Sequence, residues 1–553
     1  MFAVVLIAAA IAYALPFRQP NCNTSSHYAL VQTIASGTKT IDSIHGETCD
    51  VSWSQGHYFA NKAPGLALAT APWYAALHAL GVLRADPLSG SSYPTAMRAI
   101  PRRDLWLMGL WGAVLPALGL LWLVRSVAER LAPGAGVATA ATLAFATLLL
   151  PFSSLFFSHV LAAFLTFAAF ALVLNDHEAR WRGVALAGLL AGFAAVVEYP
   201  AGLLVLALGA YAATGHPRLR RGVMFAVGAF VGLAPLAAYD TWAFGSPFHL
   251  SYVGAVLVPG VSGHDVLGAN SVGFFGVASP HWAAGLQVLF GSRGLLTLGP
   301  VLALAPVGCI LLWKRSRRRE AAFIGGACLT FLIYNAAYYS PLGGATPGPR
   351  FLILIIPFAA LALAALVRAW PLSLLALALP SFAFLLAAHL TQPLISPPYE
   401  PKNWWHWLRS NGLSSTVLEP GAHGWLPALP IVLAALTAVT AAIGSVRETD
   451  RSDVSAALVC VVAWSTALVS FPHLARSHLG AIAIAAMLAI AVLASRRGVW
   501  GLGMIIAVGL GLDGVHRHAG LSAALGLSGL VLAIVVSKLY VSTPPVRIRE
   551  VDR

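Results

Sequence analysis

Acidic and basic side chains gather in one polar segment near the start of this otherwise apolar chain. Between residues 17 and 103, Asp42 and Asp50 lie close in sequence to His57 and Lys62. An ionised aspartate within hydrogen-bond reach can take a proton from an attacking hydroxyl, and carboxylate oxygens could instead bind a divalent cation. We therefore predict that Asp50 or Asp42 is a catalytic base. The alternative is that both are solvated loop carboxylates.

Two cations stand where they could hold an anion. Lys62 precedes a rigid Pro64-Gly65 turn and an apolar helix, so its ammonium group could bind a phosphate as a point charge. Arg350 follows a Thr-Pro-Gly-Pro segment at the outer end of a helix, where a guanidinium group could stabilise a leaving phosphate. The alternatives are a lysine that snorkels from a helix end and a structural arginine ion pair.

A third candidate is Glu198, which ends an apolar run in the sequence Val-Glu-Tyr-Pro. An ionisable residue near membrane depth is costly, so it indicates a functional site. We predict that Glu198 contacts substrate. It could equally be a buried partner of Arg350 or Lys62.

Cys22 and Cys49 both fall in the polar segment. An oxidising exterior would allow them to pair, and closing a loop of this length would add roughly 3 kcal/mol of stability. The pair would fix the chain immediately before Asp50. The alternative is two unrelated free thiols.

The rest of the chain must supply the scaffold for these residues, and it is apolar almost throughout. Of 553 residues 58% are hydrophobic and 10% charged, whereas soluble proteins average about 25% charged. Runs approaching the roughly 20 residues that span a bilayer recur along the sequence. We predict an all-α polytopic membrane protein with 14–16 transmembrane helices. Clear candidates are 105–123, 157–174, 224–239, 295–312, 351–366, 429–443 and 521–536.

Topology also explains the net charge of +14. If the amino terminus is cytoplasmic, more than half of the Lys and Arg residues fall in short cytoplasmic loops, such as the cluster 314–319, as the positive-inside rule expects. Nucleic-acid binding would need a basic folded surface, and none is evident. Residues 1–15 lack the basic region and cleavage site of a signal peptide, so we expect them to form the first transmembrane helix.

The larger polar loops then all face outward. We expect a surface helix at 27–36 and an interfacial or re-entrant helix at 65–83 in the first outer loop, 17–103. We assign residues 1–370 to a catalytic region and 371–553 to a C-terminal transmembrane region with an outer loop at 389–424. Nucleotide-binding loops, Cys/His metal spacings and the Gly-x-Ser-x-Gly elbow are missing from the sequence.

Four segments resemble the GT-C glycosyltransferases of the family 39/protein-mannosyltransferase type, in particular the bacterial group related to the aminoarabinose transferase of lipid A. The resemblance covers most of residues 1–370. The segments are His27-Tyr28-Ala29-Leu30 with Ser36-Gly37, Gly56-His57-Tyr58-Phe59-Ala60-Asn61-Lys62-Ala63-Pro64-Gly65, Phe-Gly-Ser-Pro-Phe at 244–248, and Gly343-Gly344 with Gly348-Pro349-Arg350.

This resemblance implies a bundle of GT-C type and a polyprenyl-phosphate-linked sugar donor used on the outer face of the plasma membrane. It implies an aspartate base, a donor phosphate on Lys62, and substrate contacts from His27, His57 and Tyr58. Relatives place an acidic residue just before the Tyr-Ala helix, whereas this chain has Asn-Thr-Ser-Ser at 23–26. The base must then be another residue, for which Asp42 and Asp50 are the candidates.

The sequence therefore predicts a membrane glycosyltransferase that moves a sugar from a lipid phosphate to a glycan, lipid or protein acceptor. A transporter or flippase of lipid-linked saccharides is the alternative, although it would need charged residues along a path through the bilayer. A non-catalytic scaffold would not need the loop that carries carboxylates and a lysine.

Overall fold

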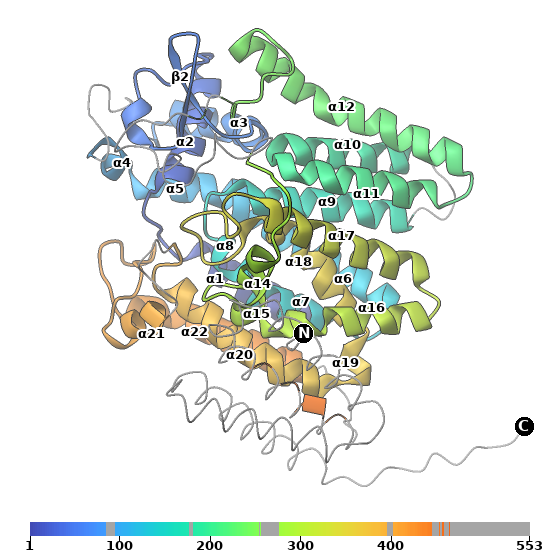
Figure 1. Ribbon diagram of the computed structural model, residues 1–553. Helices are drawn as coiled ribbons and strands as arrows, with labels where there is room; N and C mark the ends of the chain where they lie inside the picture. Colours follow the sequence, from blue (N-terminus) through green and yellow to red (C-terminus); the bar gives the residue numbers. More distant parts are fainter. Residues whose placement is uncertain are drawn as a thin grey trace, which may run out of the picture.

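The computed structural model describes residues 1–83, 95–175, 181–253, 255, 276–394 and 402–444, and single residues 453, 456, 457, 460 and 464. This part of the chain is a bundle of helices (Figure 1) with one two-stranded hairpin. The all-α fold predicted from the sequence is confirmed.

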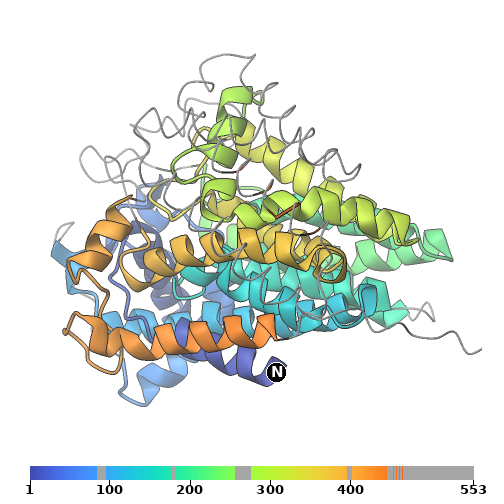
Figure 2. The ribbon, with the colours of Figure 1, turned by 90° about the horizontal axis from the view of Figure 1, so that it is seen from below.

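The elements of the polar segment and α21 (Lys402–Arg409) lie at the same end of the bundle, at the left in Figures 1 and 2. The N-terminal elements are α1 (Phe2–Ala14), α2 (Cys22–Ala35), η1 (His45–Glu47), β1 (Val51–Ser54), β2 (His57–Ala60), α3 (Gly65–Ala79), α4 (Thr95–Ala99), α5 (Arg102–Gly109), the π-helical turn η2 (Leu110–Val114) and α6 (Leu115–Leu131).

The central elements form much of the apolar bundle. They are α7 (Gly136–Phe145), α8 (Leu149–Phe152), α9 (Ser158–Asn175), α10 (Trp181–Val197), η3 (Tyr199–Ala201), α11 (Gly202–Ala213), α12 (Arg218–Phe244), α14 (Trp282–Phe290), α15 (Leu295–Leu298), η4 (Pro300–Leu304) and α16 (Ala305–Lys314). The later elements are α17 (Arg318–Ala337), η5 (Arg350–Leu354), α18 (Ile356–Leu363), α19 (Leu366–Ala369), α20 (Pro371–Leu390), α21 (Lys402–Arg409) and α22 (Trp425–Ile443).

Six helices of the described residues are long and apolar enough to cross a membrane, or seven if one bent pair counts as a span. Shorter apolar helices accompany them. Large apolar side chains on these helices are exposed, for example Phe230 at 79% and Leu206 at 74%, as expected where helices face lipid. The chain is a multi-pass membrane protein. The predicted crossing at 521–536 lies outside the described residues, so the total of 14–16 stays a prediction.

Two predicted crossings are not single helices. The run 295–312 is divided among α15, η4 and α16, and its two parts belong to a helix pair bent by 103°. The run 351–366 is divided among η5, α18 and α19. Proline explains the first break in each run, because Pro300 and Pro357 lack the N–H that an uninterrupted helix would use and their rings clash with the preceding turn.

The two helices α10 and α12 pack backbone to backbone through glycines. A Cβ added to Gly188 of α10 would lie 2.1 Å from the carbonyl oxygen of Phe225 in α12. A Cβ added to Gly228 of α12 would lie 1.9 Å from the carbonyl oxygen of Ala185 in α10. Gly192 and Gly232 make similarly close approaches one turn further along. This is the small-xxx-small spacing that lets membrane helices approach closely. It fixes the position of α10, which ends at the residue before Glu198.

The polar segment between α1 and α5 contains the elements expected there, with different bounds. Helix α2 starts at Cys22, earlier than predicted, because the Asn21 side chain accepts the backbone N–H groups of Asn23 and Thr24. An asparagine cap of this kind satisfies N–H groups that have no partner within the helix. The hairpin β1–β2 turns at Gln55-Gly56, both with positive φ, as a two-residue hairpin requires.

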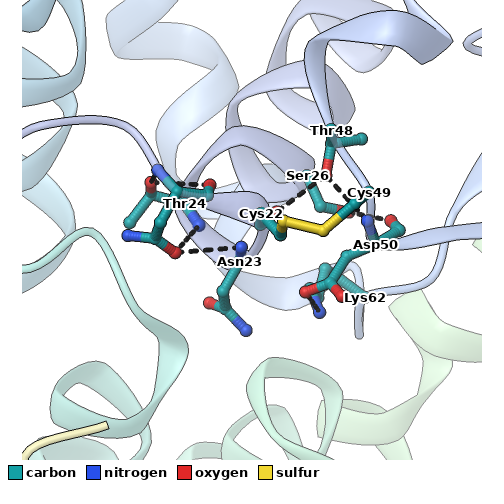
Figure 3. Close-up of a disulfide and its surroundings, with 9 residues drawn as sticks. Cys22, Asn23, Thr24, Ser26, Thr48, Cys49, Asp50 and Lys62 are labelled. Carbon is teal, nitrogen blue, oxygen red and sulfur yellow. Dashed lines mark hydrogen bonds and ion pairs between the residues drawn. A yellow bond between two sulfur atoms is a disulfide. The ribbon is translucent and has the colours of Figure 1, made fainter. Parts of the chain in front are cut away.

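The predicted disulfide between Cys22 and Cys49 is present, with a Cα–Cα distance of 5.0 Å. Figure 3 shows it beside Asp50, whose backbone is held on both sides. Thr48 Oγ1 accepts the Asp50 N–H at 3.0 Å and donates to the Cys22 carbonyl at 2.7 Å, while Ser26 Oγ donates to the Asp50 carbonyl at 2.7 Å. The disulfide and these hydrogen bonds together anchor Asp50 to helix α2.

Replacing Gly188 by alanine should lower the free energy of unfolding by about 1–3 kcal/mol, because the new methyl group overpacks the contact with α12. Gly183→Ala in the same helix is the matched control, since a Cβ there meets no atom within 4 Å. Unfolding of both variants in nanodiscs measures the difference. Equal stabilities would contradict close packing of α10 and α12.

Removing the disulfide with Cys22→Ser and Cys49→Ser together should destabilise the polar segment by roughly 3 kcal/mol, because the unfolded chain gains the entropy of the open loop. Thermal unfolding with and without a thiol reductant measures this. The reductant should destabilise the wild type and leave the double variant unchanged. A wild type that is insensitive to full reduction would contradict the prediction.

Candidate active site

The hairpin brings Asp50 and Lys62 together. In the β1–β2 register Val51 lies opposite Ala60, and just outside the hairpin the Asn61 N–H donates to the Asp50 carbonyl. Lys62 is the next residue, so its side chain comes close to Asp50. Lys62 Nζ lies 2.7 Å from Asp50 Oδ2, and the lysine is buried. Burial lowers the pKa of Lys62, and the neighbouring Asp50 carboxylate opposes this shift. A lysine buried away from water keeps its positive charge only if an opposite charge lies next to it, and the Asp50 carboxylate supplies that charge.

Lys62 lines a cavity of about 490 Å³ at the loop end of the bundle. Side chains from well-separated parts of the chain converge on it. They come from α2, the residues after β2, the start of α9, the break between α10 and η3, residues 250–252, the end of α17 and the start of η5. Its polar lining residues are Asn23, His27, Asn61, Lys62, Ser158, His159, Glu198, Tyr199, Tyr252, Tyr334, Tyr338 and Arg350. A cavity of this size with a few convergent polar groups is the usual form of a ligand site.

Arg350 is the second cation of the cavity. Its guanidinium group packs against the Phe351 ring, 5.0 Å from the ring centroid, and its Nε is buried without a hydrogen-bond partner among the described residues. No ion pair to it is found in this part of the chain. Gly343 makes room for the Arg350 side chain, because a Cβ there would lie 2.6 Å from Arg350 Cγ. The φ of Gly343 is +77°, a conformation that favours glycine.

Glu198 faces the same cavity. The chain breaks there between α10 and η3, and Glu198 lies in neither helix. Ser158 Oγ donates a hydrogen bond to Glu198 Oε2, and His159 Nδ1 lies 3.8 Å from the same oxygen. Burial raises the pKa of Glu198, while the Ser158 hydrogen bond and the positive charges of Arg350 and Lys62 oppose the shift.

His27 and His159 are buried imidazoles that line the cavity, each 2% exposed. His27 Nδ1 and His159 Nε2 lack a hydrogen-bond partner among the described residues. Burial and the positive charges of Lys62 and Arg350 lower the pKa of His27, and Asp50 opposes this. These rings therefore offer neutral nitrogens to a bound molecule.

Tyrosines form an aromatic wall beside Arg350. Tyr252 Oη lies 3.2 Å from Tyr338 Oη and 2.9 Å from Tyr339 Oη. Tyr334 stacks on Tyr338 with ring centroids 5.7 Å apart. Such rings can cover the apolar face of a sugar or a lipid chain, and their hydroxyls can hydrogen-bond to polar groups.

The structure separates the candidates from the sequence into two groups. The cavity is lined by Lys62, His27, Arg350 and Glu198. Asp50 does not line it but forms an ion pair with Lys62, which does. Asp42, His57 and Tyr58 do not line it, so the catalytic and substrate-binding roles predicted for them stay predictions.

Asp42 instead holds the hairpin. Its Oδ2 lies 2.7 Å from His57 Nδ1, its Oδ1 accepts the Tyr58 N–H at 2.7 Å, and both charged side chains are well exposed. Partial burial would raise the pKa of Asp42, but the hydrogen bonds from Tyr58 and His57 outweigh it and lower the pKa. The compact sequence spacing suggested a shared site, whereas the hairpin turn directs Asp42 and His57 to solvent.

Sequence reasoning overlooked Ser158, His159 and the tyrosines. The signal for the first two was a polar Ser-His pair at the start of the apolar run 157–174, where membrane-depth polar residues indicate function. Within the described residues, no group of three or more His, Cys, Asp or Glu side chains could hold a metal ion.

No family model matches the chain, and no curated protein matches it. Solved structures similar to it include ArnT from Cupriavidus metallidurans bound to undecaprenyl phosphate, with a TM-score of 0.46 at 15% identity over 96% of this chain and 76% of that one. The apo state of the same protein gives 0.42 at 14% identity over the same shares. The apo Archaeoglobus fulgidus oligosaccharyltransferase gives 0.37 at 11% identity, over 84% of this chain and 57% of that chain. We infer function from the cavity itself.

Proposed function

We propose that this protein is a membrane glycosyltransferase that moves a sugar from a polyprenyl-phosphate donor to an acceptor hydroxyl on the extracytoplasmic face of the plasma membrane. The observation that carries the proposal is the pair of cations, Lys62 and Arg350, in one cavity of a membrane-embedded bundle. Arg350 has no protein anion in contact among the described residues, so a bound anion would complete its coordination.

A lipid phosphate fits this arrangement on three counts. The bundle is apolar enough to accept a polyprenyl chain. The guanidinium group of Arg350 can form two parallel hydrogen bonds to a phosphate, and the ammonium group of Lys62 adds a point charge. The tyrosine wall supplies a surface against which a sugar ring can pack.

The same two cations would assist the chemistry. When the bond from the anomeric carbon to the phosphate oxygen breaks, negative charge grows on the phosphate, and donors already in place around it stabilise that charge. Asp50 keeps Lys62 charged and positioned for this task. The acceptor hydroxyl must lose a proton as it attacks, and two carboxylates, Asp50 and Glu198, lie close enough to the cavity to be considered.

The acceptor class stays open among glycan, lipid and protein. Transport or flipping of a lipid-linked saccharide is the second candidate function, because the cation pair would also hold a lipid phosphate that is carried without reaction. A divalent cation is not required by the proposal, since the two cationic side chains can neutralise the phosphate.

Replacing Lys62 or Arg350 by alanine should weaken the binding of undecaprenyl phosphate by about 10–100-fold, because each change removes charge-assisted hydrogen bonds worth about 1.5–3 kcal/mol. Binding of radiolabelled undecaprenyl phosphate in detergent micelles measures this. His57→Ala is the control, because this exposed histidine lies outside the cavity.

Transfer is tested with the same proteins in nanodiscs, using a panel of polyprenyl-phosphate sugars. The proposal expects release of polyprenyl phosphate and a glycosylated product from wild type, with loss of turnover in both cavity variants. Donor binding without any turnover, together with movement of the donor between leaflets, would replace the transferase with a flippase.

A further inference from the structure

The two carboxylates near the cavity, Asp50 and Glu198, differ in their protein partners. Asp50 Oδ2 is engaged by Lys62 Nζ at 2.7 Å, and Asp50 is not among the residues that line the cavity. Glu198 lines it. In the described part of the chain, Glu198 makes no ion pair with a lysine or arginine.

The contacts of Glu198 leave one oxygen available. Ser158 Oγ and His159 Nδ1 both approach Oε2, and no protein partner of Oε1 is found among the described residues. The His159 ring is itself fixed, with its centroid 5.6 Å from that of Phe351. A carboxylate oriented through one oxygen, with the other facing a cavity, has the geometry that a general base requires.

Resting on the proposed function, we propose that Glu198 is the general base of the transfer, and that Asp50 is a positioning residue for Lys62. The acceptor oxygen forms a bond to the anomeric carbon as the bond from that carbon to the phosphate oxygen breaks. The electron pair of the broken bond leaves with the phosphate, which Lys62 and Arg350 hold. The proton of the acceptor hydroxyl passes to Glu198 Oε1.

Electrostatics support this division of roles. Burial raises the pKa of Glu198, despite opposition from Ser158, Arg350 and Lys62, and a less acidic carboxylic acid has a more basic carboxylate. The carboxylate of Asp50 is stabilised as an anion by a lysine in direct contact, which makes it a weaker proton acceptor. Removing Asp50 would chiefly release Lys62.

The experiment compares Glu198→Gln, Asp50→Asn and Asp42→Asn in nanodiscs, with kcat and undecaprenyl phosphate binding measured for each. Glu198→Gln should lower kcat by about 10²–10⁴-fold, the usual contribution of a general base, with phosphate binding unchanged or tighter. Asp50→Asn should mainly weaken binding. Asp42→Asn should behave as wild type, because Asp42 lies outside the cavity and asparagine keeps an oxygen that accepts the Tyr58 N–H.

A Glu198→Ala variant supplies a second readout, since added formate can replace the missing carboxylate. Formate should restore part of its turnover and leave that of Glu198→Gln unchanged, because the glutamine side chain fills the space. A residue that only stabilised the fold would show no such rescue.

The outcomes separate the two proposals. Wild-type transfer with Glu198→Gln within a few-fold of its rate, or loss of kcat confined to Asp50→Asn, overturns the assignment of Glu198 and leaves the transferase intact. Absence of transfer by wild type with every donor overturns the proposed function and the base assignment with it.

Discussion

A charged side chain removed from water must find an opposite charge, and in this protein that constraint centres on Lys62. The ammonium group is buried and is held 2.7 Å from Asp50. Breaking such a pair by removing one partner typically costs about 3–5 kcal/mol, because the remaining charge is buried alone. The hairpin register, the disulfide and the Ser26 and Thr48 hydrogen bonds all fix the position of the Asp50 backbone.

The cavity depends on that pair and on interruptions of the helical scaffold. A continuous membrane helix satisfies its own backbone groups and offers apolar side chains to its neighbours. Where the chain leaves helical geometry, polar side chains can be presented at the end of a helix. Glu198 lies at the break between α10 and η3, and Arg350 begins a short 3-10 turn that precedes α18. Close packing of α10 on α12 keeps the first of these breaks in place.

The sequence predicted the fold class and most charged cavity residues, for an identifiable reason. Few charges occur in an apolar chain, so Lys62, Glu198 and Arg350 stood out by type alone. Their separation in sequence, from 62 to 350, concealed that they share one cavity. Proximity in sequence does not bring Asp42 and His57 into the cavity, because His57 starts β2 beside the turn, at the opposite end of the strand from Lys62, and Asp42 pairs with it there. Hydrophobic runs indicated spans but not their proline breaks.

Gly343 carries no chemistry, yet it sets where the guanidinium group of Arg350 can lie. Both the positive φ of Gly343 and the close approach of the Arg350 side chain favour glycine at this position. Gly343 should therefore tolerate few substitutions, although it has no functional group. Its residue type alone would suggest only a turn. In engineering terms, altering the anion site means redesigning the 343–350 segment as a unit, because its glycine and its arginine cannot be varied independently.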